Sequence, residues 1–367
     1  MMKILLLEPY YTGSHKQWAK GYQQHSINRI NILSMKGQFW KWRMHGGAVT
    51  LANKFNQSQI QPDLILATDM LDLSTFLSLT RKKTSTIPTA IYFHENQLSY
   101  PWSPTDRDYQ ENRNKHYGFI NYTSALVADH VLFNSKYHQD SFIHEAHLLL
   151  KHFPDYNELE TLSQIEKKSN VLNLGLDLKR FDFHQTNYNG PPLILWNHRW
   201  EYDKNPETFF NTLFQLDSDG IDFRLAVLGE NFKKSPSIFN QAHEKLNKKI
   251  IHFGYCESFN DYAQWLWKSD IQPVTNIQDF FGTSIMEAVY CNTYPLLPNR
   301  LTYPELLTKE YQLEHIYKND TDLLIKLKDA IINISKIRKM KFGAISKPYD
   351  WSTMVSVYDQ LLLSFID

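Results

Sequence analysis

The stretch Asp279-Phe280-Phe281-Gly282-Thr283-Ser284-Ile285-Met286-Glu287 decides how this chain is interpreted. It follows residues 270–274, an apolar run that predicts a buried strand, and Gly282 is expected to open a helix. The free backbone N–H groups and the positive dipole end of a helix start form a phosphate site. The two carboxylates, eight residues apart, then flank that phosphate. We interpret the stretch as a nucleotide-sugar site in which one carboxylate holds ribose hydroxyls and the other holds sugar hydroxyls.

A second segment, Trp196-Asn197-His198-Arg199-Trp200-Glu201-Tyr202-Asp203-Lys204-Asn205-Pro206-Glu207, supports the same interpretation. Residues 191–196 predict a strand, Asn205 is a typical helix N-cap and Pro206 is a typical first helical residue. Arg199 and Lys204 therefore bracket a strand-to-helix loop. A guanidinium and an ammonium group in that loop are suited to stabilise a departing diphosphate, on which negative charge develops.

Each segment also has a purely structural interpretation. Asp279 can stabilise a helix start and Glu287 can lie on a solvated helix face, while Arg199 and Lys204 can be ordinary surface charges. The two segments together favour the nucleotide-sugar site, because both place phosphate-binding groups beside a helix start that follows a strand.

The composition is that of a globular α/β protein. With 367 residues, of which 42% are hydrophobic and 21% charged, the chain is long enough for two domains. Its 39 basic and 39 acidic side chains give no global polyanion-binding signature, so a nucleic-acid site has to be a local patch. Residues 1–7 do not have the pattern of a signal peptide, and no apolar run approaches the ~18 residues of a membrane span. The 2 cysteines have no metal-binding spacing, and we expect a cytoplasmic protein.

Short apolar runs alternate with longer helical patterns, which is typical of parallel sheets with crossover helices. Strands are predicted at residues 3–8, 30–34, 64–68, 89–93, 130–134, 171–174, 193–197, 224–228, 250–254, 271–274 and 294–297. A linker at 184–192 separates a first domain, 1–185, from a second, 186–350, and a C-terminal helix within 351–367 can pack back on the first. The predicted fold class is α/β, with two Rossmann-like, doubly wound domains facing across a cleft and ligands at the carboxyl ends of the strands.

Candidate ligand residues in the first domain also follow predicted strands. Gly13 with Ser14 permits close backbone approach to a ligand at a helix start. His94 follows a buried strand and can hydrogen-bond a donor-sugar hydroxyl. The polar residues that come next, which can hold an acceptor, are Glu95, Asn96 and Gln97. The alternative for this segment is a polar loop with a satisfied histidine.

The run Trp40-Lys41-Trp42-Arg43 interleaves basic and aromatic side chains. That pattern suits contacts with RNA phosphates combined with base stacking. Its alternative is a helix that packs tryptophan on one face and leaves lysine solvated on the other.

Taken in order, these residues resemble a retaining glycosyltransferase with the GT-B fold, of the large family 4 group. Arg199, Lys204 and the span from Asp279 to Glu287 carry that resemblance, with Asp in place of the usual first Glu. More closely, the chain resembles the tRNA-queuosine mannosyltransferase family. The matching motifs are Gly13-Ser14-His15-Lys16-Gln17, Lys41-Trp42-Arg43, Phe93-His94-Glu95-Asn96-Gln97-Leu98, Tyr100-Pro101, Phe133-Asn134-Ser135, His198-Arg199-Trp200-Glu201, Leu228-Gly229-Glu230, Glu287-Ala288-Val289-Tyr290-Cys291 and Tyr303-Pro304-Glu305. Thr12 departs from the family, which tends to have a second Gly there.

The resemblance implies transfer of mannose from GDP-mannose to queuosine in the anticodon of aspartate tRNA, with retained anomeric configuration and with no cofactor or metal ion. It implies that Arg199 and Lys204 stabilise the departing GDP, that Glu287 holds ribose, and that Asp279 with His94 holds mannose. Donor-binding residues are then expected at Gly13, Ser14, Glu230, Gly282, Thr283, Ser284 and Glu287. Acceptor-binding residues are expected at Glu95, Asn96, Gln97, Tyr100, Trp40, Lys41, Trp42 and Arg43. The acceptor is then expected to attack the mannose on the same face that the leaving phosphate vacates, assisted by that phosphate.

Other functions stay open on the residues alone. One is a family 4-like glycosyltransferase that acts on a lipid-linked or surface polysaccharide. The others, from different classes, are a two-domain sugar-nucleotide epimerase and a non-catalytic nucleotide-sugar-binding protein. The base and the sugar of the donor come only from the resemblance, because base contacts in this fold are largely made by the backbone.

Overall fold

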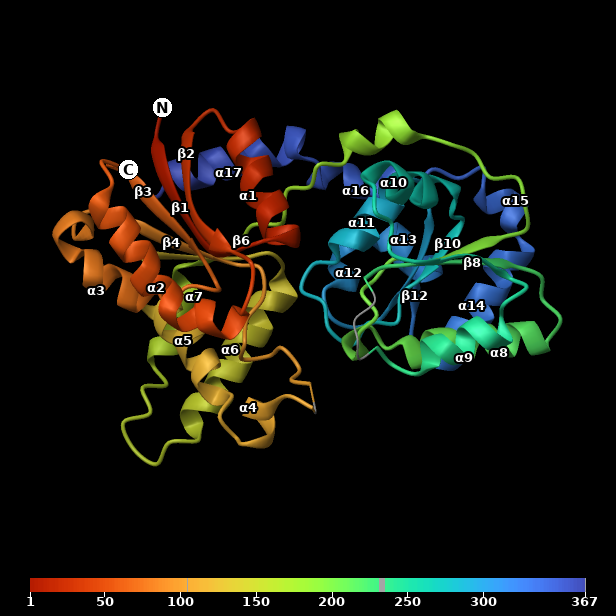
Figure 1. The fold of residues 1–367 in the computed structure, drawn as a ribbon, viewed down its shortest axis with the longest axis horizontal. Helices are drawn as coiled ribbons and strands as arrows, with labels where there is room; N and C mark the ends of the chain where they lie inside the picture. The colour runs from red at the N-terminus through yellow and green to blue at the C-terminus, as the bar shows by residue number, and fades with distance from the viewer. Residues whose placement is uncertain (104, 231–234, 367) are drawn as a thin grey trace. The chain divides into compact units, whose positions relative to one another are not determined.

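The computed structural model describes residues 1–103, 105–230 and 235–366, and the chain divides into two compact units (Figure 1). The first unit contains Met1–Leu176 together with Trp351–Asp367, and the second contains Asp177–Asp350. The division therefore lies before the predicted linker at 184–192. The physical reason is Phe181, which is buried in the hydrophobic core of the second unit. Its carbonyl accepts a hydrogen bond from the indole of Trp267 at 2.8 Å.

The first unit is built on a six-stranded sheet with the order β2-β1-β3-β4-β5-β6, in which all pairs are parallel. Its strands are β1 (Lys3–Tyr11), β2 (Arg29–Lys36), β3 (Leu64–Thr68), β4 (Thr89–Phe93), β5 (His130–Phe133) and β6 (Ser169–Val171). The order reverses between β1 and β3. In open parallel sheets, ligands bind beside the carboxyl ends of the strands at such a switch point.

Helices cover both faces of this sheet (Figure 1). The helices of the first unit are α1 (Gly13–His25), α2 (Trp40–Gln57), α3 (Leu73–Thr84), α4 (Arg107–Gln110), α5 (Lys115–Val127), α6 (Lys136–Lys151), α7 (Thr161–Lys167) and α17 (Trp351–Leu363). Contacts link α2, α3, α5, α6 and α7 into one layer, while α1 and α17 pack together. Burial on both faces explains why the inner strands β3 and β4 are continuous apolar runs, whereas the edge strands β2 and β6 contain polar and exposed residues.

The C-terminal helix α17 belongs to the core of the first unit. The indole of Trp18 in α1 donates to the hydroxyl of Tyr358 at 3.0 Å, and the Tyr22 hydroxyl donates to Asp359 at 2.9 Å. The ring of Trp351 fills the space beside Gly21, where an added Cβ would come within 2.0 Å of it. The last segment of the chain is thus held by specific contacts with α1.

The second unit has a six-stranded parallel sheet with the order β12-β11-β10-β7-β8-β9. Its strands are β7 (Leu193–Trp196), β8 (Arg224–Leu228), β9 (Ile250–Gly254), β10 (Ile271–Pro273), β11 (Tyr294–Pro298) and β12 (Ile316–Tyr317). Its α-helices are α8 (Pro206–Ser218), α9 (Ile238–Lys245), α10 (Phe259–Lys268), α11 (Thr283–Tyr290), α12 (Tyr303–Leu306), α13 (Lys309–His315), α14 (Asp320–Ile332), α15 (Ile334–Ile337) and α16 (Gly343–Ser346). The described residues of this unit also form the 3-10 turns η1 (Lys179–His184), η2 (Tyr202–Lys204) and η3 (Lys347–Tyr349).

The switch point of the second sheet lies between β7 and β10. Contacts join α8 to α9 and α14, and join α11 to α10 and α16, in keeping with the two groups of helices visible in Figure 1. Among the described residues, no helix combines the length and the apolar character that crossing a bilayer requires.

Candidate active site

The two predicted donor segments meet at the switch point of the second sheet. The loop after β7 carries Arg199 and Lys204, and the loop after the neighbouring β10 leads into α11. The hydroxyl of Thr275 joins the loops by donating to the carbonyls of Lys204 at 3.0 Å and Asn205 at 2.9 Å. Asn205 is the N-cap of α8 and Pro206 its first residue, as predicted. Two segments far apart in sequence thus form one edge of the second unit.

Arg199 and Lys204 have different surroundings. The side chain of Lys204 is 13% exposed, its Nζ donates to the carbonyl of Gln278 at 3.0 Å, and it lies 3.2 Å from the carboxylate of Asp203. The side chain of Arg199 is 50% exposed, with Nη2 3.0 Å from the carboxylate of Glu201. Lys204 is therefore held by the loop that precedes α11, whereas the guanidinium of Arg199 is accessible to a ligand.

The start of α11 has the geometry of an anion site. Gly282 is its N-cap with φ 90°, in the left-handed region that favours glycine, and the helix begins at Thr283. No side chain of the described residues caps this helix start, so its first backbone N–H groups are available to an anion. Asp279 is half-buried, and its Oδ2 accepts hydrogen bonds from Tyr303 and Asn276, both at 3.2 Å. These bonds hold one carboxylate beside the helix start.

Glu287 is buried, and both of its carboxylate oxygens have partners. Oε1 accepts from the guanidinium of Arg180 at 3.1 Å, and Oε2 accepts from the hydroxyl of Tyr262 at 2.8 Å. Burial raises the pKa of Glu287 more than Arg180 and Tyr262 lower it. The alternative that Glu287 lies on a solvated helix face is wrong, because the residue is only 8% exposed. A ribose hydroxyl would have to share this carboxylate with its present partners.

His198 is a candidate site residue to which the sequence interpretation gave no role. Its Nδ1 lies 3.2 Å from the hydroxyl of Ser284 on α11, and its buried Nε2 has no partner among the described residues. Burial, followed by the charges of Lys204 and Arg199, lowers the pKa of His198 to about 3, so the ring is neutral near pH 7. The signal for it in the sequence is its position directly before Arg199, after a buried strand.

The other predicted donor residues occupy varied places. Thr283 and Ser284 are half-buried on the first turn of α11. Glu230 is exposed, and its carbonyl accepts a hydrogen bond from the backbone N–H of Trp200 at 3.1 Å. Gly13 begins α1 with φ 48°, and it is exposed together with Ser14. These residues belong to different units, Gly13 and Ser14 to the first and the others to the second.

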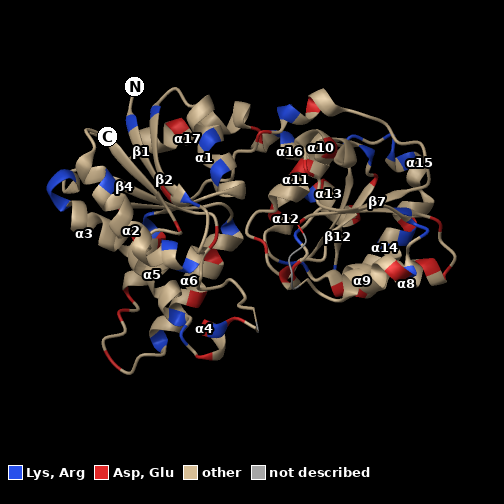
Figure 2. Cartoon of the chain, in the orientation of Figure 1, with Lys and Arg blue, Asp and Glu red and all other residues tan. Residues whose placement is uncertain are grey.

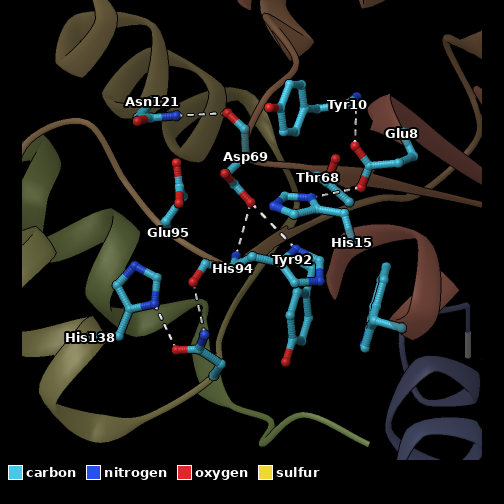
Figure 3. A network of polar contacts seen from close by, with 12 residues as sticks. Glu8, Tyr10, His15, Thr68, Asp69, Tyr92, His94, Glu95, Asn121 and His138 are labelled. Carbon is cyan, nitrogen blue, oxygen red and sulfur yellow. Dashed lines mark hydrogen bonds and ion pairs between the residues drawn. The ribbon is translucent and has the colours of Figure 1, made fainter. Parts of the chain in front are cut away.

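The first unit holds a buried polar network where β1, β3 and β4 end (Figure 3). Glu8 accepts a hydrogen bond from the backbone N–H of Tyr10 at 2.8 Å and lies 3.0 Å from Nδ1 of His15. Asp69 accepts from the backbone N–H of His94 at 2.9 Å, and its carboxylate is 3.4 Å from Nδ1 of the same residue. The network thus pairs each of two histidines with one carboxylate.

His94 is fixed by its backbone and by its ring. Its carbonyl accepts from the side-chain amide of Asn134 at 2.9 Å. Its ring lies on that of His15, with centroids 4.3 Å apart and planes at 30°, and meets Trp18 and Tyr92 edge-on at 4.6 and 4.8 Å. Its buried Nδ1 and Nε2 both lack a hydrogen-bond partner among the described residues, although Nδ1 lies 3.4 Å from the carboxylate of Asp69. The neighbours of His94 thus leave it little freedom to change rotamer.

The two stacked histidines differ in charge. Burial opposes protonation of His15, but the attraction of Glu8 and the hydrogen bond to it raise the pKa of His15 to about 9. Burial and the charge of His15 lower the pKa of His94 well below its ordinary value. Burial also raises the pKa of Asp69 to about 7. Near neutral pH, a cationic His15 therefore lies against a neutral His94.

We expect the first unit to lose stability as the pH rises from 6.5 to about 9. The folded state binds the proton of His15 more tightly than the unfolded state, so this contribution is complete below 6.5 and is lost as the pH rises through about 9. Asp69, whose pKa is also raised, adds a loss of the same sign between 3.8 and about 7. Each pKa unit corresponds to about 1.4 kcal/mol.

Urea unfolding at several pH values, followed by pulse hydrogen exchange of first-unit peptides, measures this slope. Glu8→Gln should flatten it above pH 6.5, because a neutral amide does not hold the extra proton on His15. An unchanged slope in the variant would contradict the ion pair.

The ligand atoms of Glu8, His15 and His94 lie within 4.8 Å of one another, close enough to hold a metal ion. Two features fit a hydrogen-bonded pair better. The imidazole planes are stacked at 30° instead of converging on one point, and both oxygens of Glu8 already accept hydrogen bonds.

The predicted acceptor residues after β4 mostly hold their own loop. The side-chain oxygen of Asn96 accepts from the backbone N–H groups of Leu98 and Ser99 at 3.0 and 2.9 Å, and Asn96 is fully buried. The side-chain amide of Gln97 donates to Glu95 at 3.0 Å. Glu95 and Tyr100 are half-buried, so these two residues are the more accessible part of the predicted set.

The run from Trp40 to Arg43 begins α2 and divides by exposure. Trp40 packs on Trp102 and Tyr117, with ring centroids 5.7 and 5.2 Å apart. Lys41 lies 2.7 Å from a carboxylate oxygen of Asp106 and also pairs with Asp108. Both residues thus have structural partners. The other two members of the run remain candidates for an acceptor contact: Trp42 is exposed, and Arg43 is half-buried with its Nε donating to the carbonyl of Lys36 at 3.0 Å.

Comparison with known proteins shows which families this chain matches. Residues 3–176 match the family described as tRNA-queuosine alpha-mannosyltransferase N-terminal, and residues 179–344 match Glycosyl transferases group 1. A Drosophila melanogaster tRNA-queuosine alpha-mannosyltransferase is 33% identical over 335 residues, which cover 88% of this chain and 85% of that protein.

Solved structures with low sequence identity share the fold. Anabaena Alr3699/HepE in complex with UDP superposes with a TM-score of 0.69 at 15% identity, over 99% of this chain and 100% of that one. Sucrose-phosphate synthase from Thermosynechococcus elongatus gives a TM-score of 0.70 at 13% identity, over the same shares of 99% and 100%. The two doubly wound units and these matches define a glycosyltransferase with the GT-B fold. Within that class, the chain belongs to the tRNA-queuosine mannosyltransferase family.

Proposed function

We propose that this protein transfers mannose from GDP-mannose to queuosine in the anticodon of aspartate tRNA, with retention of anomeric configuration. The observation that carries the proposal is the 33% identity, over 88% of the chain, to a Drosophila melanogaster protein named for mannosyl transfer to tRNA queuosine. A tRNA acceptor would place the reaction in the cytoplasm.

The second unit supplies the groups that a nucleotide diphosphate needs. The start of α11 would bind phosphate oxygens through backbone N–H groups, while Arg199 and Lys204 would neutralise the charge that develops on the leaving diphosphate. Lys204 is in place before the reaction, because its Nζ is hydrogen-bonded to the carbonyl of Gln278 and the two loops are joined through Thr275. Glu287 would contact ribose hydroxyls.

The first unit would supply the contact to the mannose. His94 is neutral, and an Nδ1–H directed at Asp69 would leave Nε2 as a hydrogen-bond acceptor for a sugar hydroxyl. Asp279 would hold a second hydroxyl. The acceptor hydroxyl of queuosine would attack on the face that GDP leaves, with a phosphate oxygen of GDP taking its proton.

The donor is tested by thermal shift of the wild-type protein. At equal concentration, GDP-mannose is expected to raise the melting temperature more than UDP-glucose, because a ligand that binds only the folded state stabilises it more when its dissociation constant is lower. A larger shift with UDP-glucose would contradict the donor assignment, although it would leave the fold and the glycosyltransferase class untouched.

We expect transfer to persist in EDTA. Charge neutralisation is assigned to Arg199, Lys204 and the start of α11, so a divalent ion has no assigned role at the diphosphate. The measurement is transfer by protein dialysed against EDTA, compared with the same protein after Mn²⁺ or Mg²⁺ is added back. A strict requirement for either ion would contradict the site as described.

A further inference from the structure

Helix α2 begins with two exposed aromatic side chains. Phe39, its N-cap residue, is 76% exposed, and Trp42, one turn later, is 62% exposed. Phe39 has φ 54° and ψ 57°, a left-handed conformation that a bulky residue seldom adopts and that costs free energy. A strained helix start that leaves two rings in solvent contributes little to packing of the first unit.

The indole of Trp42 is oriented by a glycine. A Cβ added to Gly46, one turn further along α2, would lie 2.4 and 2.5 Å from Cζ2 and Cε2 of the indole. The ring therefore lies against the helix over Gly46, and much of the rest of its surface is open. Glycine in a helix interior is unfavourable relative to alanine, so this arrangement is kept at some cost to the stability of α2.

The surface around Trp42 is locally basic in a chain with no net charge. Residues 36–45 and 106–116 contain six basic and three acidic side chains, while the whole chain has 39 of each. The two segments adjoin, because Lys41 pairs with Asp106 and Asp108 and the ring of His45 stacks on that of His116 at 5.0 Å. Figure 2 shows both signs of charge along α4.

Not all of these charges are compensated. Within the segment 106–116, the acidic side chains form ion pairs with Lys41, Arg107 and Arg113. By contrast, Lys36, Arg43 and Lys115 make no ion pair with the part of the chain that the structure describes. The surface around α2 thus combines an oriented, exposed indole with three cations that have no carboxylate partner among the described residues.

We propose that Trp42, held flat by Gly46, is the platform on which an unpaired RNA base stacks, with Arg43, Lys36 and Lys115 contacting neighbouring phosphates. The inference rests on the proposed function, which supplies a single-stranded RNA loop as acceptor. Stacking on an aromatic ring together with basic side chains along the backbone is how single-stranded RNA is commonly bound. Lys41 is excluded from this role, since its charge is already shared with Asp106 and Asp108.

The test is the affinity of the full-length protein for a synthetic anticodon stem-loop RNA that lacks queuosine, measured over a salt series. Trp42→Ala should weaken binding about five- to hundredfold with an unchanged salt slope, because stacking contributes little to counterion release. Arg43→Ala should lower the log–log slope by about 0.7. Gly46→Ala should also weaken binding, because the new methyl group displaces the indole, although alanine favours the helix and should not lower the melting temperature.

Two controls make the result specific. Tyr156→Ala removes another exposed aromatic side chain of the first unit, 90% exposed, and should leave RNA affinity unchanged. A fully duplex RNA of equal length should bind more weakly and should not distinguish Trp42→Ala or Gly46→Ala from the wild-type protein. Wild-type affinity in both Trp42→Ala and Gly46→Ala would overturn the platform, and so would an equal loss for stem-loop and duplex. If Trp42→Ala fails to fold, the RNA affinity of Gly46→Ala alone tests the platform.

The outcome separates this inference from the proposed function. Trp42-dependent binding of the stem-loop, with no mannose transferred to queuosine-containing tRNA, would leave the platform standing and refute the reaction. If the wild-type protein transfers mannose but its RNA affinity is unchanged in Trp42→Ala and Gly46→Ala, the reaction stands and the platform is refuted. Displacement of the RNA by an anionic polysaccharide whose own binding depends equally on Trp42 would also overturn the inference, since it would assign the surface to another acceptor.

Discussion

Arg199→Ala and Lys204→Ala should each lower turnover by about 10²–10³-fold, the usual effect of removing one preorganised group from a site of developing charge. The loss should appear mainly in kcat, because the charge on the diphosphate grows as the glycosidic bond breaks. The measurement is steady-state transfer of labelled mannose, with the melting temperature as a check on folding. Near-wild-type turnover in both variants would rule out the leaving-group role.

Two further variants separate charge from position. Thr275→Val removes hydrogen bonds between the two loops but keeps both cations, so its loss of turnover should be smaller than that of Lys204→Ala. Arg224→Ala removes a guanidinium at the amino end of β8, away from the carboxyl ends where the site lies, and should keep wild-type turnover. A loss in Arg224→Ala as large as in Arg199→Ala would point to general destabilisation.

Glu287→Ala is expected to destabilise the second unit by about 2–4 kcal/mol. Removing one partner of a fully buried ion pair costs about 3–5 kcal/mol, and the side chain of Arg180 is 28% exposed, which lowers the penalty. The hydroxyl of Tyr262 would also lose its acceptor. Chemical denaturation, followed in second-unit peptides by hydrogen exchange, gives the free energy of unfolding.

The double variant Arg180→Leu with Glu287→Leu tests whether Glu287 also binds the donor. Apolar replacement of both partners of a buried ion pair often restores stability. If Glu287 contacts ribose, affinity for GDP should stay low although stability recovers. Recovery of both quantities would make Glu287 a structural residue only.

The strands were the most predictable part of the fold. The predicted bounds of β3, β4, β8 and β9 are those of the structure, because each is a short, largely apolar run. The strands β3 and β4 and most of β8 are buried on both faces, whereas the edge strand β9 is partly exposed. The two-residue β12 is too short to leave a pattern. The domain boundary was placed too late, because Asn, Gly and Pro at 187–192 mark the approach to β7 and not the end of the first unit.

The candidate site was predictable where one segment carries its own signal. The start of α11 and the loop after β7 were recognised because a strand, a polar loop and a helix start follow one another in sequence. The pairs of Glu8 with His15 and Asp69 with His94 were not predicted. The second pair joins residues far apart in the chain, and only the order of the strands brings their ends together.

The sequence pattern also could not predict which of these side chains are buried. Trp40 and Trp42 belong to the same basic and aromatic run, yet one packs on Trp102 and Tyr117 while the other is exposed. Their difference depends on neighbours from the segment after β4 and from α5. A local pattern therefore locates the candidate acceptor surface but does not assign its residues.

The most direct test is incubation of the wild-type protein with labelled GDP-mannose and total tRNA, prepared with or without queuosine. Nucleosides from the recovered tRNA are then separated and weighed by mass spectrometry. We expect one added hexose on queuosine from aspartate tRNA, and no label in tRNA that lacks queuosine. Label in queuosine-free tRNA, label in a lipid or polysaccharide fraction instead, or no transfer by protein that binds GDP-mannose would contradict it.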